Sequence, residues 1–126
     1  MYGVPYHFLA VHFPLVLVLL ALFCDLRGSY DQGYRLTLGA AVAALIAVAT
    51  GLMLAGGQLS RMTVHAGSAL TGSFLILVLA MLRYSRSARE DEPHAAYPTV
   101  WMVMEASAAL LIVWSAVTGH RAVLGF

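Results

Sequence analysis

Charged residues are scarce in this chain of 126 residues: they make up 10% of it, and the seven basic residues are all Arg. A soluble domain usually carries about 25% charged and about 45–50% apolar residues, whereas 61% of this chain is hydrophobic. The formal net charge is only +1 and no basic patch is present, so the usual electrostatic basis for binding nucleic acid is missing. The composition excludes an ordinary soluble domain, a disordered chain and a nucleic-acid-binding protein.

Cysteine and catalytic motifs are also nearly absent. Cys24 is the single cysteine, so the chain has no internal disulfide and no multi-cysteine metal or iron–sulfur site. The sequence has no phosphate-binding loop, no HExxH motif and no nucleophile and base at a recognisable spacing. We therefore do not expect a free-standing enzyme. At most, the chain would be a redox subunit of an oxidoreductase complex.

Long apolar runs fill most of the sequence, and they predict four helices at about residues 6–25, 35–55, 61–83 and 99–119. About 20 apolar residues are enough to cross the hydrocarbon of a bilayer as a helix, and backbone groups in lipid must be satisfied within each segment. Short connections make successive helices antiparallel neighbours. The expected fold is all-α: a single transmembrane domain over residues 1–126, forming an integral membrane antiparallel four-helix bundle.

The distribution of Arg predicts the orientation of this bundle. Arg61 and Arg121 lie at the end that holds both chain termini, here called the outer end, and the other five lie at the opposite, inner end. Those five are Arg27, Arg35, Arg83, Arg86 and Arg89. Cytoplasmic ends of membrane helices carry the excess of Lys and Arg. We therefore expect a multi-pass protein of the bacterial inner membrane with both termini outside.

Four of the five histidines fall at the outer end: His7, His12, His65 and His120. Ionisable side chains within a span are costly and usually face the bundle interior with a partner. By the rise of about 1.5 Å per residue, His12 and His65 lie at similar depth. Two neutral imidazoles at equal depth on facing helices suit the two axial positions of a haem iron. The sequence therefore predicts His12 and His65 as axial metal ligands of a haem b near the outer face.

One face of the third helix is predicted to complete this cofactor site. Arg61, His65, Ser68 and Gly72 share that face by their helical spacing. Arg61 is expected to anchor a propionate, whereas Ser68 and Gly72 would let a flat ring approach the backbone.

Three more residues at the outer end are candidates for cofactor binding. As a second pair, His7 and His120 would hold a metal or hydrogen-bond a propionate or a quinone, and Arg121 would add a donor. Two other interpretations stay open. Small residues on one helical face also serve ordinary helix packing, and interfacial histidines also form structural hydrogen bonds. Met62 and Met53 near His65 favour a copper site as the competing alternative, since thioether and imidazole suit Cu(I).

Glu105 lies several residues inside the fourth apolar run. A lipid-facing carboxylate is costly, so this side chain should face protein. It would serve as a proton-relay group or a quinone contact, or else as a hydrogen-bonded clamp to Thr50, Ser73 or a partner subunit. No basic residue is expected within a span to neutralise it.

The segment from His7 to Pro14, HFLAVHFP, followed by an apolar run and Asp25, resembles the start of a bacterial family of predicted four-helix integral membrane proteins of unknown function. The dipeptide Thr50-Gly51, His65 and Gly119 are similar as well. This resemblance covers nearly the whole chain and implies fold and topology without an activity. More loosely, four helices with histidines sorted to one end resemble small haem-b membrane cytochromes.

These observations predict a haem-b-binding membrane protein, an electron-transfer subunit of a larger membrane redox complex. Its expected partners are lipid, other membrane subunits or further copies of the chain, and a periplasmic electron carrier or quinone. The alternative is a non-catalytic structural or assembly subunit of a membrane complex. A second alternative is copper or proton handling through the histidine cluster and Glu105.

Overall fold

The computed structural model describes residues 4–56, 63–89 and 97–124, and in this part of the chain it contains four α-helices. They are α1 (Val4–Leu26), α2 (Tyr30–Ala55), α3 (Thr63–Ala88) and α4 (Thr99–Leu124). Each of them is long and apolar enough to cross a membrane. The prediction of an all-α chain with four such helices is therefore confirmed.

The helices extend beyond the apolar runs that predicted them. At the inner end, α2 begins at Tyr30 instead of about residue 35, and α3 continues to Ala88 instead of about residue 83. The polar residues at the start of α2 are compatible with a helix, as the Asp31–Arg35 ion pair one turn apart illustrates. Hydropathy therefore locates the membrane-spanning part of a helix, whereas backbone hydrogen bonding decides where the helix ends.

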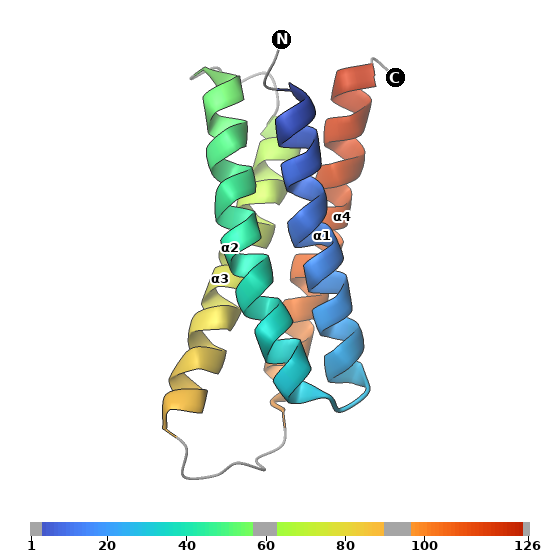
Figure 1. The fold of residues 1–126 in the computed structure, drawn as a ribbon. Helices are drawn as coiled ribbons and strands as arrows, with labels where there is room; N and C mark the ends of the chain where they lie inside the picture. The colour runs from blue at the N-terminus through green and yellow to red at the C-terminus, as the bar shows by residue number, and fades with distance from the viewer. Residues whose placement is uncertain (1–3, 57–62, 90–96, 125–126) are drawn as a thin grey trace.

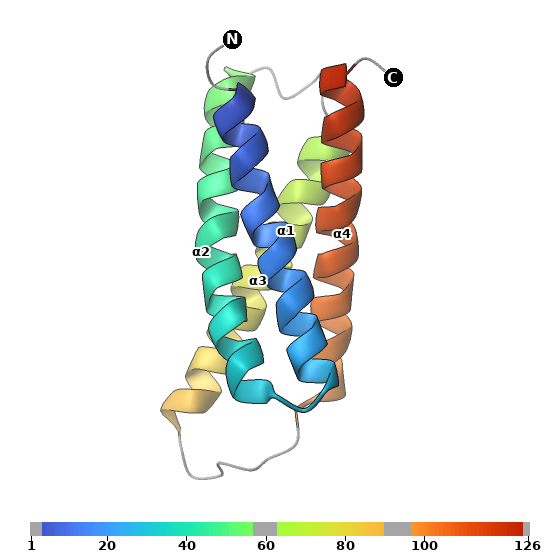
Figure 2. The ribbon, with the colours of Figure 1, turned by 45° about the vertical axis from the view of Figure 1, so that its right-hand side comes forward.

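Figure 1 shows the four helices side by side, each running back along the one before, with the first turn of α1 and the last turn of α4 at the same end. α1 packs mainly on α2, and α3 mainly on α4. The structure therefore consists of two helical hairpins, α1–α2 and α3–α4. In Figure 2, α1 and α4 lie close near the inner end and diverge toward the outer end.

The two hairpins bury corresponding positions. Val18 and Asp25 of α1 match Ile76 and Arg83 of α3 at a constant spacing along the sequence. In the same way, the buried Thr37, Ala40 and Ala41 of α2 match the buried Glu105, Ala108 and Ala109 of α4. His7 of α1 and His65 of α3 are separated by the same number of residues as Asp25 and Arg83. The two hairpins therefore bury equivalent positions along their helices.

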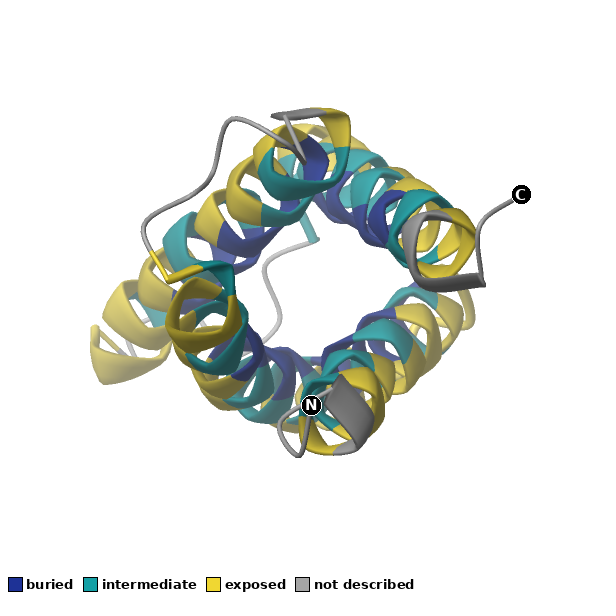
Figure 3. Cartoon of the chain, turned by 90° about the horizontal axis from the view of Figure 1, so that it is seen from above, coloured by how far each residue is buried: buried dark blue, intermediate teal, exposed yellow. Residues whose placement is uncertain are grey.

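Small side chains dominate the buried centre of the bundle. The core cluster includes Ala40, Ala41, Ala80, Ala108 and Ala109, and Figure 3 shows buried residues on the inward faces of the helices. Small residues let membrane helices approach closely. Large apolar side chains are exposed instead, among them Phe13, Leu45, Phe74 and Leu110. This distribution suits an apolar environment around the bundle.

A buried ion pair joins the hairpins near the inner end. Arg83 donates to the two carboxylate oxygens of Asp25 at 2.6 and 3.0 Å, and the two side chains are 4% and 0% exposed. Arg83 also donates to the carbonyl oxygen of Tyr30 at 2.8 Å and to the Thr37 hydroxyl at 3.1 Å. Gly33 leaves the room needed, because a Cβ there would collide with the Asp25 carboxylate. The bidentate, charge-assisted geometry is the strong form of such a pair.

We predict that Asp25→Ala destabilises the folded chain by about 3–5 kcal/mol, because it leaves the Arg83 guanidinium buried without its carboxylate. The matched control is Arg35→Ala, which breaks an ion pair whose side chains are 78% and 76% exposed and should change the stability very little. Unfolding in mixed micelles with a denaturing detergent, followed by circular dichroism, measures both. Equal unfolding midpoints for the two variants would contradict the prediction.

Candidate functional site

A cavity of about 870 Å³ lies in the outer half of the bundle, and all four helices line it. Small residues leave this space open: Ala47, Gly51, Ala55, Ala66, Ala69, Ala116 and Gly119. Ligand and cofactor pockets usually measure roughly 300–1,000 Å³ and are mostly apolar with a few placed polar groups. The cavity is therefore large enough for an organic cofactor.

His7 of α1 lines this cavity and is held against α2. Its Nδ1 lies 3.0 Å from the hydroxyl oxygen of Thr50, and the Thr50 hydroxyl itself donates to the carbonyl oxygen of Ala47 at 3.0 Å. Since the only hydroxyl hydrogen of Thr50 is committed there, Thr50 accepts from the Nδ1–H of His7. Gly51 brings the backbone close to the ring, since a Cβ there would lie 3.0 Å from Cε1 of His7.

His65 of α3 is held against α4 in the equivalent way. Its Nδ1 lies 2.8 Å from the carbonyl oxygen of Ser115, and a carbonyl oxygen can only accept, so Nδ1 carries the hydrogen. Gly119 is again the close neighbour, because a Cβ there would lie 2.6 Å from Cε1 of His65. Each hairpin therefore presents one histidine whose ring packs on a glycine of the partner helix.

The two rings lie close together within the cavity lining. Their centroids are 6.5 Å apart, and their planes are inclined at 88°. Both carry the hydrogen on Nδ1, so both Nε2 atoms keep a lone pair, and among the described residues neither Nε2 has a hydrogen-bond partner. A metal–imidazole bond is about 2 Å long, so two rings on opposite sides of one ion have centroids roughly 6 Å apart. The centroid distance between His7 and His65 is close to the distance between two imidazoles on one ion.

The histidine ring that lies beside His65 is therefore that of His7, whereas the sequence predicted His12. The Nδ1–H of His12 donates to the carbonyl oxygen of Phe8 in its own helix at 2.6 Å, and the ring is exposed. His12 follows His7 by five residues, which is about 140° around the helix. The expectation used depth along the helix and left out this rotation. His12 still lines the cavity, at its rim.

The face of α3 that lines the cavity differs from the expected face. Ser68 donates to a carbonyl oxygen of its own helix, and Gly72 packs against α4, so neither of them lines the cavity. The lining continues instead from His65 through Ala69 and Ser73. These residues follow the row with a spacing of four, which diverges from the predicted row as the helix turns.

Of the remaining candidates at the outer end, some line the cavity and others do not or lie outside the described residues. His120 and Arg121 line the cavity and are exposed, and the Phe8 ring lies 5.9 Å from the His120 ring. Arg61, the expected propionate anchor, lies outside the described residues, as does Met62. Met53, the other expected copper ligand, is 82% exposed.

Glu105 lies in the inner cluster, away from the histidines. It is fully buried, it accepts from the Tyr97 hydroxyl at 3.5 Å, and its Oε1 lies 3.9 Å from the Arg83 guanidinium. Oε1 has no hydrogen-bond partner among the described residues. Within this part of the chain, the hydroxyl of Thr50 donates to Ala47 and not to Glu105. The expectation that no basic residue lies within a span is wrong, because the candidate span Val64–Ala88 contains Arg83, whose side chain is buried beside Glu105.

Tyr97 completes this cluster just before α4 begins. Its ring lies 4.7 Å from the Arg83 guanidinium carbon. Burial, together with the nearby Glu105 carboxylate, raises the pKa of Tyr97 above its ordinary value of 10.0. The phenol therefore stays protonated and keeps its role as a donor to Glu105.

The buried ion pair between Asp25 and Arg83 was not predicted from the sequence. One signal was available: Asp25 follows His7 at the same spacing as Arg83 follows His65. Opposite charges at matched positions of two equivalent helices indicate a pair between them.

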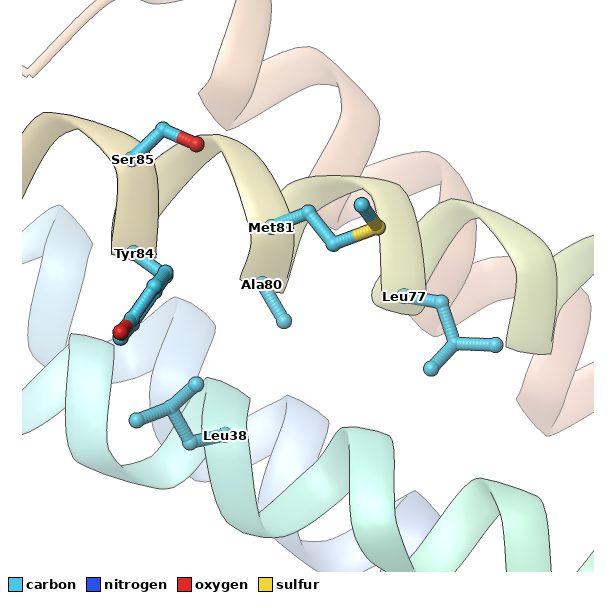
Figure 4. Close-up of a pocket in the computed structure, with 6 residues that line it drawn as sticks. All are labelled: Leu38, Leu77, Ala80, Met81, Tyr84 and Ser85. Carbon is cyan, nitrogen blue, oxygen red and sulfur yellow. The ribbon is translucent and has the colours of Figure 1, made fainter.

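A second hollow lies between α2 and α3, on another part of the surface. Figure 4 shows Ala80 and Tyr84 of α3 pointing toward Leu38 of α2. Apart from the hydroxyls of Tyr84 and Ser85 its lining is apolar, and it contains no histidine or charged residue.

Comparison with known proteins finds no matching family model, curated protein or solved structure. The resemblance to the four-helix membrane family therefore stays a prediction. Function has to be inferred from the geometry of the chain itself.

We predict that Gly119→Ala displaces the His65 ring, because the new Cβ would lie 2.6 Å from its Cε1. The control is Gly67→Ala, also in a helix, where a Cβ meets nothing within 4 Å. Nitrogen NMR of histidine-labelled protein in micelles reports the ring hydrogen bond. The Nδ1–H signal of His65 should shift or exchange faster in Gly119→Ala alone, and identical spectra for the two variants would contradict this geometry.

Proposed function

We propose that this chain is a haem-b-binding membrane protein that transfers electrons, with His7 and His65 as axial ligands. One observation carries the proposal: these two imidazoles lie 6.5 Å apart in the cavity lining, and Nδ1 of each is hydrogen-bonded to the partner helix of its own hairpin. A hydrogen bond at one ring nitrogen fixes the tautomer and orients the other nitrogen toward a metal.

A porphyrin suits this site better than a bare metal ion. The described residues contain no group of three or more His, Cys, Asp or Glu that could hold a metal, so an ion between two histidines needs further ligands from outside the protein. A porphyrin supplies four nitrogens and fills an apolar space. Copper is less suitable, because no Met or Cys is among the residues that the structure describes as lining the cavity.

Ligation by two histidines points to electron transfer. His7 and His65 would together hold a haem without leaving a ligand position for oxygen or a substrate, and the group would then supply exchange of electrons. This is also the reason why we do not propose a separate enzymatic activity for the chain.

The proposed setting is a bacterial inner membrane, crossed by an antiparallel bundle with both termini outside. Arg27, Arg35 and Arg89 at the inner end support this orientation, as expected for a cytoplasmic side. The haem would then lie near the outer face, within reach of a periplasmic carrier or of quinone in the surrounding lipid. The exposed apolar surface of all four helices leaves room for neighbouring subunits or further copies.

We predict that protein isolated from haem-replete membranes contains haem b with a six-coordinate, low-spin spectrum. His7→Ala and His65→Ala each remove one axial ligand and should abolish haem binding or make it high-spin. His12→Ala removes an imidazole at the rim of the cavity, and any haem that this variant binds should stay six-coordinate and low-spin. Absorption spectra and pyridine haemochrome analysis measure this. A colourless wild-type protein would refute the proposal, and loss of haem in His12→Ala but not in His7→Ala would return the ligand role to His12.

The inclination of 88° between the two rings gives a further spectroscopic expectation. Imidazole planes that are nearly perpendicular on one ferric haem produce a highly anisotropic low-spin signal in electron paramagnetic resonance, whereas nearly parallel planes produce a rhombic one. We therefore expect the highly anisotropic signal from the oxidised protein. A rhombic low-spin signal would contradict the observed arrangement of His7 and His65.

A further inference from the structure

The cavity is polar on one side and apolar on the other. On the side of α1 and α4, its lining includes the exposed His12, His120 and Arg121, with Phe8 among them. The Phe8 ring lies 4.5 Å from the His12 ring and 5.9 Å from the His120 ring, so these three rings are neighbours, and Arg121 follows His120 in the chain and also lines the cavity. We call the patch formed by Phe8, His12, His120 and Arg121 the α1–α4 rim.

The described lining on the side of α2 and α3 contains no arginine, and its one imidazole is the half-buried His65. The large side chains that these two helices add to the lining are all aliphatic: Val48, Leu52, Leu54 and Leu70. The rest of their contribution, apart from His65 and Ser73, is Ala and Gly. A ligand filling the cavity between the hairpins therefore meets the exposed His12, His120 and Arg121 at one edge. At the other edge, apart from His65 and Ser73, it meets hydrocarbon.

We infer that the α1–α4 rim is a carboxylate-binding site that holds the two propionates of the porphyrin, with Arg121 as the principal donor. This inference rests on the proposed function and deepens it, because it assigns one in-plane orientation to the ring. It also gives His12 and His120 a place at the polar edge of the cofactor, beside Arg121, instead of at the iron.

The physical basis is the cost of burying charge. A carboxylate placed against the Leu-rich side would lose its hydration without gaining a partner, which is strongly unfavourable. At the α1–α4 rim the same carboxylate meets Arg121, whose guanidinium is always charged and whose planar fork matches a carboxylate in bidentate geometry. The rim is also exposed, so the outer part of each carboxylate keeps contact with water. The apolar edge of the ring then packs among the leucines of α2 and α3.

The experiment compares two ligands that differ only in these charges. The apo-protein in nanodiscs of uncharged phosphatidylcholine is titrated at neutral pH with haemin and with haemin dimethyl ester, in which both carboxylates are neutral. Arg121→Gln removes the donor from the rim. Arg35→Gln is the matched control, because Arg35 is an exposed arginine at the opposite end.

We expect the wild-type chain and Arg35→Gln to bind haemin about tenfold more tightly than the ester, since charge-assisted bonds are the stronger ones. Arg121→Gln should lose most of this preference through weaker haemin binding, with the affinity for the ester unchanged. An equal loss for both ligands, or no loss for either, would overturn the rim assignment.

The outcomes separate this inference from the function on which it rests. A low-spin, bis-histidine spectrum with both ligands but without preference for haemin overturns the rim assignment alone. Absence of that spectrum with either ligand overturns the proposed function and the rim assignment with it. If Arg121 instead serves lipid phosphate, Arg121→Gln leaves the haemin preference intact in nanodiscs of either uncharged or anionic lipid, and this too overturns the assignment.

Discussion

The arrangement of the two hairpins depends on the buried ion pair between Asp25 and Arg83. Because Arg83 bonds both carboxylate oxygens of Asp25, α1 and α3 are held in one register near the inner end. His7 precedes Asp25 by the same spacing as His65 precedes Arg83. This equal spacing is consistent with the two histidine rings lying close together at the outer end. An interaction at one end of the bundle thus sets the geometry of the site at the other.

Small residues have different roles in the centre of the bundle and in its outer half. In the centre, Ala40 and Ala108 are completely buried, and they let the helices pack closely into a core. In the outer half, where α1 and α4 diverge, similar residues such as Ala47, Ala69 and Gly51 line open space. The difference comes from the distance between the hairpins and not from the residue types. The bundle is therefore closely packed in its inner half and contains the cavity in its outer half.

The sequence predicts at which end of the bundle the histidines gather, but not which of them lies beside His65. The concentration of histidines at the outer end follows from their positions along four apolar runs, and the cavity lies there. The choice of His12 over His7 used depth along α1, whereas the structure shows that rotation around the helix decides which ring approaches His65. Glu105 was expected to be buried, as it is. Arg83, which the sequence places at the inner end because the apolar run ends there, is buried beside it.

Local properties of the sequence determined the class of this protein. Four helices and the sorting of histidine and arginine to opposite ends can be derived from run length, hydropathy and the rise per residue, since these depend only on neighbours along the chain. The tertiary structure alone decided which histidines form the pair, which face of α3 lines the cavity and where Arg83 points. Those outcomes depend on the rotation of each helix about its own axis. That rotation is set by contacts such as Asp25 with Arg83 and His65 with Ser115, between residues far apart in the chain.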